Sequence, residues 1–250
     1  MTALPSASAT PPPTTRPRRR DWRPKLRWFA AEILIVVCGV LIALTLNAWW
    51  ANRQRAADEA ALRAELRRDV VATREILAGR LELSRVGAER ARDILRVMAD
   101  GADGPARDSA LAQVGSVFTF GIWTPANDTY EEALGSGRLA LLTDAELRLA
   151  LTRYRARSAR VGDSYRLIQT QYYEELEPFM VANLVYSEVA LGTWRDSLVQ
   201  GPFRTDYDAL ARSPELWNLV TLRLEWDVDL QASLSLLDTL AADVLDRLDS

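Results

Sequence analysis

The sequence predicts an all-α protein in which one N-terminal transmembrane helix continues into an elongated antiparallel helical bundle. Two observations carry this prediction. An apolar run of 22 residues extends from Phe29 to Trp50, which matches the roughly 20 residues that a helix needs to cross a bilayer core. From Asn52 onward apolar residues recur at intervals of three or four, the period of an amphipathic helix, and no alternating strand pattern of useful length interrupts them.

Composition narrows the functional classes. The 250 residues are 48% hydrophobic, which is enough for a packed core, and they include no histidine. The chain therefore has no Ser-His-Asp or Cys-His catalytic pair, no H-E-x-x-H zinc site and no His-ligated haem. The formal net charge of -3 lacks the basic excess of a nucleic-acid binder. We expect no enzymatic activity, no cofactor, no metal and no nucleic-acid partner.

Residues 1–27 predict a disordered, basic, Pro-rich tail. Five of the eleven prolines lie within residues 1–20, among Ala, Ser and Thr. A segment of this composition buries too little apolar surface to offset the entropy of ordering it. Its basic residues cluster toward the apolar run, because residues 1–31 hold seven Lys and Arg and one acid. We expect this tail on the cytoplasmic side of the membrane.

Residues 28–51 predict the transmembrane helix itself. Glu32 and Asn47 are its strongly polar residues, one near each end of the apolar run. Tryptophans stand on both sides of the run, where the interfacial aromatic belt of a membrane protein lies. The residues of this predicted belt are Trp22, Trp28, Trp49 and Trp50. The lipid bilayer is therefore an expected partner of the chain.

Positive charge predicts the orientation of this helix. Seven Lys and Arg residues precede the apolar run, whereas five arginines follow it within residues 53–68. The positive-inside rule then places the N-terminus in the cytoplasm and residues 52–250 on the periplasmic side of a bacterial inner membrane. A cleaved signal peptide is the alternative. The run is longer than a signal-peptide core and ends in Asn-Ala-Trp-Trp rather than a small-x-small cleavage site, which favours a single-pass signal anchor.

Residues 52–250 predict an extracytoplasmic domain of three long helices and two short ones. The first long helix continues from the membrane and stops at residues 100–105, which contain two glycines and a proline. A short helix is expected around residues 111–118. A second short helix opens at a capping box of Asp128 and Glu131 and ends at residues 135–137. The apolar positions of the first helix are Leu62, Leu66, Val70, Leu77, Leu81, Ala88, Ala91, Leu95 and Met98.

The second long helix has the clearest heptad, which begins behind a capping box of Thr143 and Glu146. Pro178 is expected to kink this helix, and Gly192 or the Gly201–Pro202 pair marks its outer limit. The heptad positions are Leu147, Leu151, Tyr154, Ser158, Val161, Tyr165, Ile168 and Tyr172.

The last long helix is predicted to begin at Ser213 as N-cap, with Pro214 at the first helical position. Its apolar positions continue to the C-terminus and predict one buried face. They are Leu219, Leu222, Trp226, Leu230, Leu237, Leu240, Val244 and Leu248. Cys38 lies in the middle of the apolar run, so it forms no structural disulfide within the exterior domain, which must be held by packing alone.

Two blocks of sequence resemble a family of uncharacterised bacterial single-span membrane proteins, a domain of unknown function. The first block opens with Glu32-Ile33, has a central Gly39 and a Leu-Ile-Ala-Leu segment at 41–44, and closes with Asn47 and Trp49. The second consists of Thr124-Pro125, Thr129-Tyr130-Glu131, Leu134, Ser136-Gly137-Arg138-Leu139 and Leu147-Arg148 through Tyr154. Gly135 stands where the family pattern has another small polar residue. The resemblance implies the single-span topology and no chemistry.

One face of the membrane helix is a candidate interface. At 100° per residue Glu32, Gly39, Ala43 and Asn47 share one side, with the small-xxx-small pair between two polar groups. This pattern is typical of helix–helix packing and predicts a homo-oligomer or a contact with another membrane protein. The alternative is that Glu32 and Asn47 simply reach the headgroup region.

A second candidate site lies on the heptad helix. Arg153, Arg157 and Arg160 share a helical face that could hold an anion or ligand, although a solvated face beside an apolar seam explains the same pattern. The heptad tyrosines Tyr154, Tyr165 and Tyr172 are core residues in the simplest interpretation. A line of tyrosines could also border a ligand cavity.

These observations predict a bitopic membrane protein that acts as an interaction or scaffold module in the cell envelope. The alternative is a periplasmic ligand-sensing bundle that signals through a membrane partner, and a carboxylate-dependent hydrolase ranks third. A polar, Arg-lined cavity within the bundle would favour the sensor. A dry, fully packed seam with an exposed apolar patch would favour the scaffold.

Overall fold

The computed structural model describes residues 23–119, 121, 123–190 and 196–249. Within these residues every regular element is helical and there is no strand, so the all-α prediction is confirmed. The predicted disorder of residues 1–22, the belt position of Trp22 and the helix limit at Gly192 lie outside the described residues. By its internal contacts the chain divides into two units, residues 1–55 and residues 56–250.

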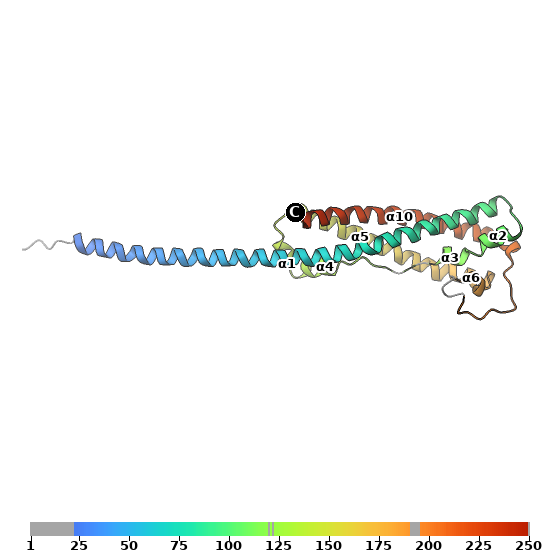
Figure 1. The fold of residues 1–250 in the computed structure, drawn as a ribbon, viewed down its shortest axis with the longest axis horizontal. Coiled ribbons are helices and arrows are strands. Elements are labelled where there is room, and N and C mark those ends of the chain that lie inside the picture. The colour runs from blue at the N-terminus through green and yellow to red at the C-terminus, as the bar shows by residue number, and fades with distance from the viewer. Residues whose placement is uncertain (1–22, 120, 122, 191–195, 250) are drawn as a thin grey trace, which may run out of the picture. The chain divides into compact units, whose positions relative to one another are not determined.

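Three long helices dominate the described chain, as predicted: α1 (Arg23–Ala99), α5 (Ala145–Gln171) and α10 (Pro214–Leu248) (Figure 1). The connections contain more short helices than the two expected from the sequence. These are α2 (Gly104–Leu111), α3 (Val114–Phe118), α4 (Asp128–Gly135), a 3-10 turn η1 (Arg138–Leu141), a π-helical turn η2 (Tyr172–Leu176), α6 (Glu177–Asn183), α7 (Tyr186–Val189) and α9 (Tyr207–Ala211).

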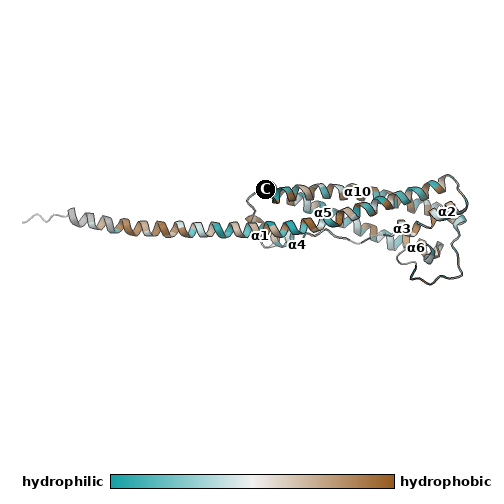
Figure 2. Cartoon of the chain, viewed as in Figure 1, coloured by the Kyte–Doolittle hydropathy of each residue, from teal (hydrophilic) through white to brown (hydrophobic). Residues whose placement is uncertain are grey.

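In the first unit, the part of α1 that contains the apolar run exposes its side chains. Every side chain described between residues 28 and 50 is exposed, including Trp28 and Ile35, and an added Cβ at Gly39 would meet nothing within 4 Å. Figure 2 shows the run as a continuous hydrophobic stretch near the start of α1. Among the described residues, α1 is the one helix whose length and composition would allow it to cross a membrane.

In the second unit, residues 56–99 of α1 pack against α5 and α10. Two clusters of buried apolar side chains form the core of residues 56–249, which we call the helical unit. The first joins the three long helices through residues such as Leu62, Leu151 and Leu237. The second lies among α1, α2, α3, α6, α9 and α10 and includes Ile94, Phe118, Met180, Leu210 and Val220. Burial of these two clusters is the main stabilising term of the unit.

The described residues between α3 and α4, namely 119, 121 and 123–127, set the helix directions, and we call them the extended segment. Along it, Gly121 contacts the Arg80 side chain, the Ala126 amide donates to Thr73 Oγ1 at 3.2 Å, and the Thr129 amide that follows donates to Asp69 Oδ2 at 3.1 Å. The segment therefore runs back along α1 before α5 begins. As a result α5 is parallel to α1, and α10 is antiparallel to both, so the predicted antiparallel arrangement is wrong for α5 (Figure 1).

The heptad of α5 is confirmed from Leu147 to Ile168, since every predicted position in that range is buried. Tyr172 is half-buried instead, and its neighbour Gln171 is buried. A π-helical turn then begins at Tyr172, and the next buried position is Leu176. Pro178 explains the turn: it has no N–H to donate, and its ring would collide with the carbonyl of residue 174 in a regular helix. The predicted kink is thus a π-helical turn just before the proline.

The buried face of α10 differs from the predicted one. Leu222 is exposed, and Leu219, Trp226 and Leu240 are only half-buried. The buried positions instead follow an unbroken heptad with gaps of four and three along the whole helix. These positions are Leu216, Val220, Arg223, Asp227, Leu230, Leu234, Leu237, Ala241, Val244 and Leu248. A charged pair therefore occupies two successive positions of an otherwise apolar seam. The predicted start is confirmed, because the Ser213 hydroxyl accepts the Leu216 amide at 3.1 Å.

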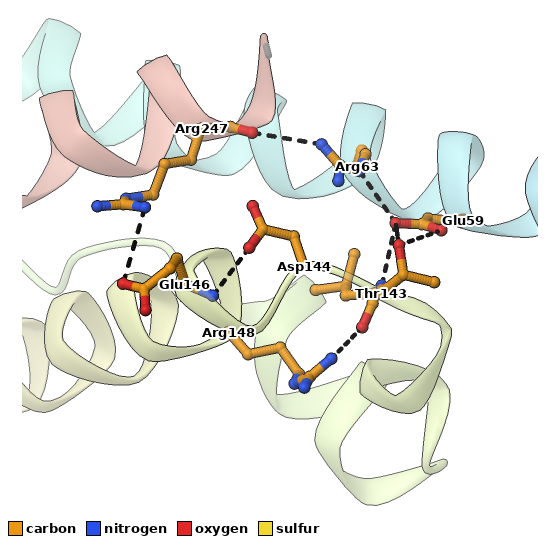
Figure 3. Close-up of polar contacts among 8 residues, drawn as sticks. Glu59, Arg63, Thr143, Asp144, Glu146, Arg148 and Arg247 are labelled. Carbon is orange, nitrogen blue, oxygen red and sulfur yellow. Dashed lines mark hydrogen bonds and ion pairs between the residues drawn. The ribbon is translucent and has the colours of Figure 1, made fainter.

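Carboxylates of α1 satisfy backbone amides at the starts of other helices, and the two predicted capping boxes do not form. The cap of α5 is Asp144, which accepts the Glu146 amide at 2.8 Å. Thr143 instead donates its amide and its hydroxyl to Glu59, each at 3.2 Å (Figure 3). In α4 the side chain of Asp128 makes no cap, and Asp69 of α1 accepts an amide of its first turn. At α5 the distant Glu59 thus replaces Glu146 as acceptor of the Thr143 amide, while the local Asp144 replaces Thr143 as the cap.

The heptad of α10 predicts that two leucines, which lie two residues apart, contribute very differently to the free energy of unfolding. Leu234 is fully buried and Leu236 is 45% exposed. We expect Leu234→Ala to lower the free energy of unfolding of the full chain by about 2–5 kcal/mol, because it opens a cavity in the core. The control, Leu236→Ala, should cost less than about 1 kcal/mol. Chemical unfolding followed by circular dichroism measures both, and equal losses would refute the register.

Glu59 predicts a pH-dependent contribution to stability. Burial alone would raise the pKa of Glu59, but hydrogen bonds from the Thr143 amide, Arg63 and the Thr143 hydroxyl lower it below its ordinary value of 4.5. A lowered pKa stabilises the folded state above about pH 4.5, and this contribution is lost as the pH falls through the folded-state value.

We expect Glu59→Gln to lower the free energy of unfolding at pH 7 by about 1–2 kcal/mol, because it weakens a charged hydrogen-bond acceptor. Unfolding curves at pH 7 and at about pH 3.5 provide the measurement, and the difference between the two proteins should shrink at the lower pH. A difference that grows on acidification would show that the carboxylate does not act through these bonds.

Candidate functional site

The helical unit contains a cavity of about 310 Å³ among its helices. α1, α3, α5, α10 and the first residues of the extended segment all contribute to its wall. The polar and charged side chains of the wall are Arg80, Ser84, Arg90, Ser116, Thr119, Tyr165, Arg223 and Asp227. The apolar ones are Leu83, Val86, Val117, Ile168 and Leu230. A volume of this size lies at the lower end of the range for small-molecule sites.

The buried pair of α10 forms the centre of this wall. Arg223 Nη2 donates to Asp227 Oδ1 at 3.1 Å and to the Thr119 carbonyl at 3.4 Å. The two side chains are only 8% and 1% exposed. Three of their buried atoms have no hydrogen-bond partner among the residues that the structure describes: Arg223 Nε, Arg223 Nη1 and Asp227 Oδ2. The pair is thus half-satisfied, which is costly for buried charged groups.

Residues of α1 surround Asp227. The Ser84 hydroxyl donates to the Asp227 carbonyl at 2.8 Å, and Gln231 Nε2 donates to the Ser84 carbonyl at 3.2 Å. Gly87 makes room for the carboxylate, because a Cβ there would lie 2.8 Å from Asp227 Oδ2. Burial raises the pKa of Asp227 to about 6, against the opposing effects of Arg223 and Ser84.

Arg80 and Tyr165 lie beside the pair. The guanidinium carbon of Arg80 is 5.9 Å from the centre of the Tyr165 ring, a cation–π distance, and the edge of that ring meets Trp123 in a T-shaped contact at 6.1 Å. A Cβ at Gly121 would collide with the Arg80 side chain, so glycine permits this close approach. Burial raises the pKa of the Tyr165 hydroxyl, and the positive charges of Arg80 and Arg223 oppose the rise.

The wall therefore combines an excess of positive charge with apolar surface. Arg80, Arg90 and Arg223 contribute three positive charges, and Asp227 contributes at most one negative charge. Guanidinium N–H groups in a low-dielectric site are strong donors for an anion. Among the described residues, no three His, Cys, Asp or Glu side chains gather where they could hold a metal ion.

The arginines predicted as an anion face do not line this cavity. Arg153 and Arg160 are exposed, and Arg157 is half-buried with its Nε donating to the Ser233 carbonyl at 3.2 Å. Burial and the nearby Arg160 lower the pKa of Arg157. Of the three heptad tyrosines, Tyr154 and Tyr165 both lie in the first core cluster, and Tyr165 also borders the cavity. Tyr172 is half-buried against the second cluster.

The residues predicted for the membrane helix lie exposed on α1. Glu32, Gly39, Ala43 and Asn47 are all exposed, so a packing role for this face stays a prediction. Trp28, Trp49 and Trp50 of the predicted belt are exposed as well. The Arg53 guanidinium carbon lies 5.8 Å from the centre of the Trp49 ring.

The sequence interpretation missed Arg80, Ser84, Arg223 and Asp227. A signal for the pair was present in α10. Counting back from Leu248 in steps of four and three gives an unbroken register to Leu216, and within it positions 223 and 227 are the charged ones. A buried ion pair in a heptad is expensive, so this register points to a site.

Comparison of the chain with protein-family models, with curated proteins and with solved structures finds no match. The resemblance to single-span membrane proteins of unknown function therefore stays a prediction.

Proposed function

We propose that the protein is a membrane-anchored, ligand-binding helical module that takes a small molecule into the cavity between α1, α5 and α10. One observation carries the proposal: the cavity wall holds a buried guanidinium and a buried carboxylate whose hydrogen bonds are incomplete. Of the two functions predicted from the sequence, ligand sensing is favoured by an Arg-lined cavity.

The stability of the folded protein does not explain why Arg223 and Asp227 stand in the apolar seam of α10. A buried ion pair gains little over well-packed apolar residues, because desolvation offsets the attraction between the charges. The rest of the α10 seam consists of Leu, Val and Ala, so two more apolar residues would continue it. A ligand that completes the hydrogen bonds of Arg223 and Asp227 supplies a reason for keeping them.

The membrane anchor in this proposal is the apolar part of α1, residues 28–51. Its length, its exposed side chains and the exposed Trp28, Trp49 and Trp50 support it. The excess of Lys and Arg before the run supports a cytoplasmic N-terminus and a periplasmic helical unit in a bacterial inner membrane. An interaction role through Glu32, Gly39, Ala43 and Asn47, with a second copy or another membrane protein, is the second candidate, and the small residues of that face favour it.

Replacing the pair tests the proposed function. In the double variant Arg223→Met/Asp227→Leu the α10 seam becomes apolar throughout, so we expect the melting temperature of the full chain to stay the same or rise. Ligand binding should be lost. The probes are small acids, amides and amines, each with a six-carbon or benzyl-sized body, added to the protein in lipid nanodiscs and followed by thermal shift and calorimetry.

A matched control removes an exposed pair. Arg85 and Glu82 form an ion pair on the surface of α1, with side chains 51% and 58% exposed. The variant Glu82→Gln/Arg85→Gln should keep both stability and binding. The proposal fails if no probe binds the wild-type protein, or if the Arg223→Met/Asp227→Leu variant unfolds at a much lower temperature, since the pair would then be structural.

Labelling of a single cysteine tests the orientation. Ser235 is exposed on α10, and Cys38 is the one native cysteine. In a Cys38→Ser/Ser235→Cys variant produced in bacteria, a membrane-impermeant maleimide should label the protein in cells whose outer membrane alone is permeabilised. Recovery of the protein in the carbonate-washed membrane fraction confirms anchoring. Labelling that requires disruption of the inner membrane would contradict the orientation.

A further inference from the structure

We propose that the ligand of the cavity is a small organic anion with an apolar body, and that it binds together with one proton, which Asp227 accepts. This inference rests on the proposed function, because it assigns a ligand class and a regulation to the same cavity. Its three parts are the charge of the ligand, its apolar body and the proton, and each follows from different residues.

The negative charge of the ligand follows from the buried N–H groups of Arg223 that have no acceptor among the described residues. Arg223 Nε and Nη1 are buried and have no partner, while its Nη2 is already held by Asp227 and the Thr119 carbonyl. Arg80 and Arg90 of α1 bring two more guanidinium groups to the same wall. A cation would be repelled by this arrangement. A neutral molecule could accept the hydrogen bonds of Arg223, but once Asp227 is protonated it would leave the buried Arg223 guanidinium without a counter-charge.

The apolar body follows from the rest of the wall. Leu83 and Val86 of α1, Val117 of α3, Ile168 of α5 and Leu230 of α10 surround the charged centre. A strongly hydrated inorganic anion would lose water on entering and gain no contact with these side chains. An acid with a short hydrocarbon or aromatic body buries apolar surface against them, and its charged end reaches Arg223.

The position of Asp227 beside Arg223 explains why the anion binds together with a proton. Asp227 is already an anion for Arg223, at 3.1 Å, and its Oδ2 is buried without a partner. A second anion at Arg223 would face this carboxylate across a low-dielectric site and be repelled. Protonation removes the repulsion and converts Asp227 into an O–H donor for the ligand. The proton comes from solvent and is released again when the anion leaves.

The groups around Asp227 favour coupling between anion binding and protonation of Asp227. Arg223 contacts Asp227 from α10, and the charge of Asp227 acts on the Tyr165 hydroxyl of α5. Arg80 and Arg90 of α1 line the same cavity, and Asp227 is the one acid among the described residues of its wall. Burial has already raised the pKa of Asp227 to about 6, so protonation near neutral pH is accessible.

Thermodynamic linkage fixes the direction in which pH changes the stability of the protein and its affinity for the anion. A carboxyl whose folded-state pKa is raised binds its proton more tightly in the folded protein, so it favours folding at low pH and loses that contribution as the pH rises through about 6. A bound anion raises the pKa of Asp227 further, and protonation strengthens anion binding by the same factor.

Calorimetry on the full chain in nanodiscs tests the inference. The probes are hexanoate and benzoate, their amides hexanamide and benzamide, and the amines hexylamine and benzylamine, with empty nanodiscs as blank. We expect the two acids to bind on the order of tenfold more tightly at pH 5.5 than at pH 7.5. Repeating the titration at pH 7.5 in buffers with different ionisation enthalpies should show uptake of nearly one proton per anion.

The variant Asp227→Asn separates the proton from the anion, since Asn keeps the shape of the protonated carboxyl. We expect Asp227→Asn to bind benzoate at pH 7.5 as tightly as the wild type does at pH 5.5, with no pH dependence and no proton uptake. Asp229→Asn is the matched control, because Asp229 is exposed on the same helix. It should keep the pH dependence of the wild type.

The outcomes separate this inference from the proposed function. Binding of the amides or amines in preference to the acids would overturn the anion while leaving a ligand cavity in place. Equal binding of the acids at both pH values would overturn the proton. If none of the probes binds, the proposed function fails as well. Binding that persists in Arg223→Met/Asp227→Leu would place the probe outside the cavity and overturn both.

Discussion

In α10 a guanidinium and a carboxylate lie within a seam that is otherwise made of Leu, Val and Ala. The Arg223–Asp227 contact of 3.1 Å satisfies one oxygen and one nitrogen, and three other polar atoms of the pair stay buried without partners. Both side chains are buried in the seam, and both line the cavity beside it. The two charged heptad positions therefore give the cavity its polar centre, and the surrounding residues accommodate that constraint.

The neighbours of the pair are brought there by the topology. Because the extended segment returns along α1, the Thr119 carbonyl and Gly121 reach the wall, and α5 runs parallel to α1 with Tyr165 beside Arg80. Gly87 and Gly121 leave space for Asp227 and Arg80. Buried clusters on either side of this level fix the helices. Along α10 the Arg223–Asp227 pair thus lies between two apolar clusters, and the low dielectric around the buried pair strengthens its electrostatic interactions.

Much of the fold follows from apolar periodicity, and the site does not. The heptad of α5 and the Ser213 cap of α10 depend on residues close in the sequence, so they could be predicted. The cavity depends on Arg80, Tyr165 and Arg223, which lie on different helices and meet only after packing. The spacing of apolar residues in α10 predicts that Leu222 is buried and leaves Asp227 out of the buried face, because charged residues usually face solvent. The parallel α5 was missed because no local pattern encodes the return of the extended segment.

The titration of the Asp227 carboxyl tests the central claim most directly. In full-length protein labelled with carbon-13 at aspartate carboxyls, the Asp227 signal is the one that disappears in Asp227→Asn. Its pKa should be about 6 without ligand and higher in the presence of benzoate. A carboxyl that stays ionised down to about pH 4, as an ordinary aspartate does, and that does not respond to benzoate would contradict the account.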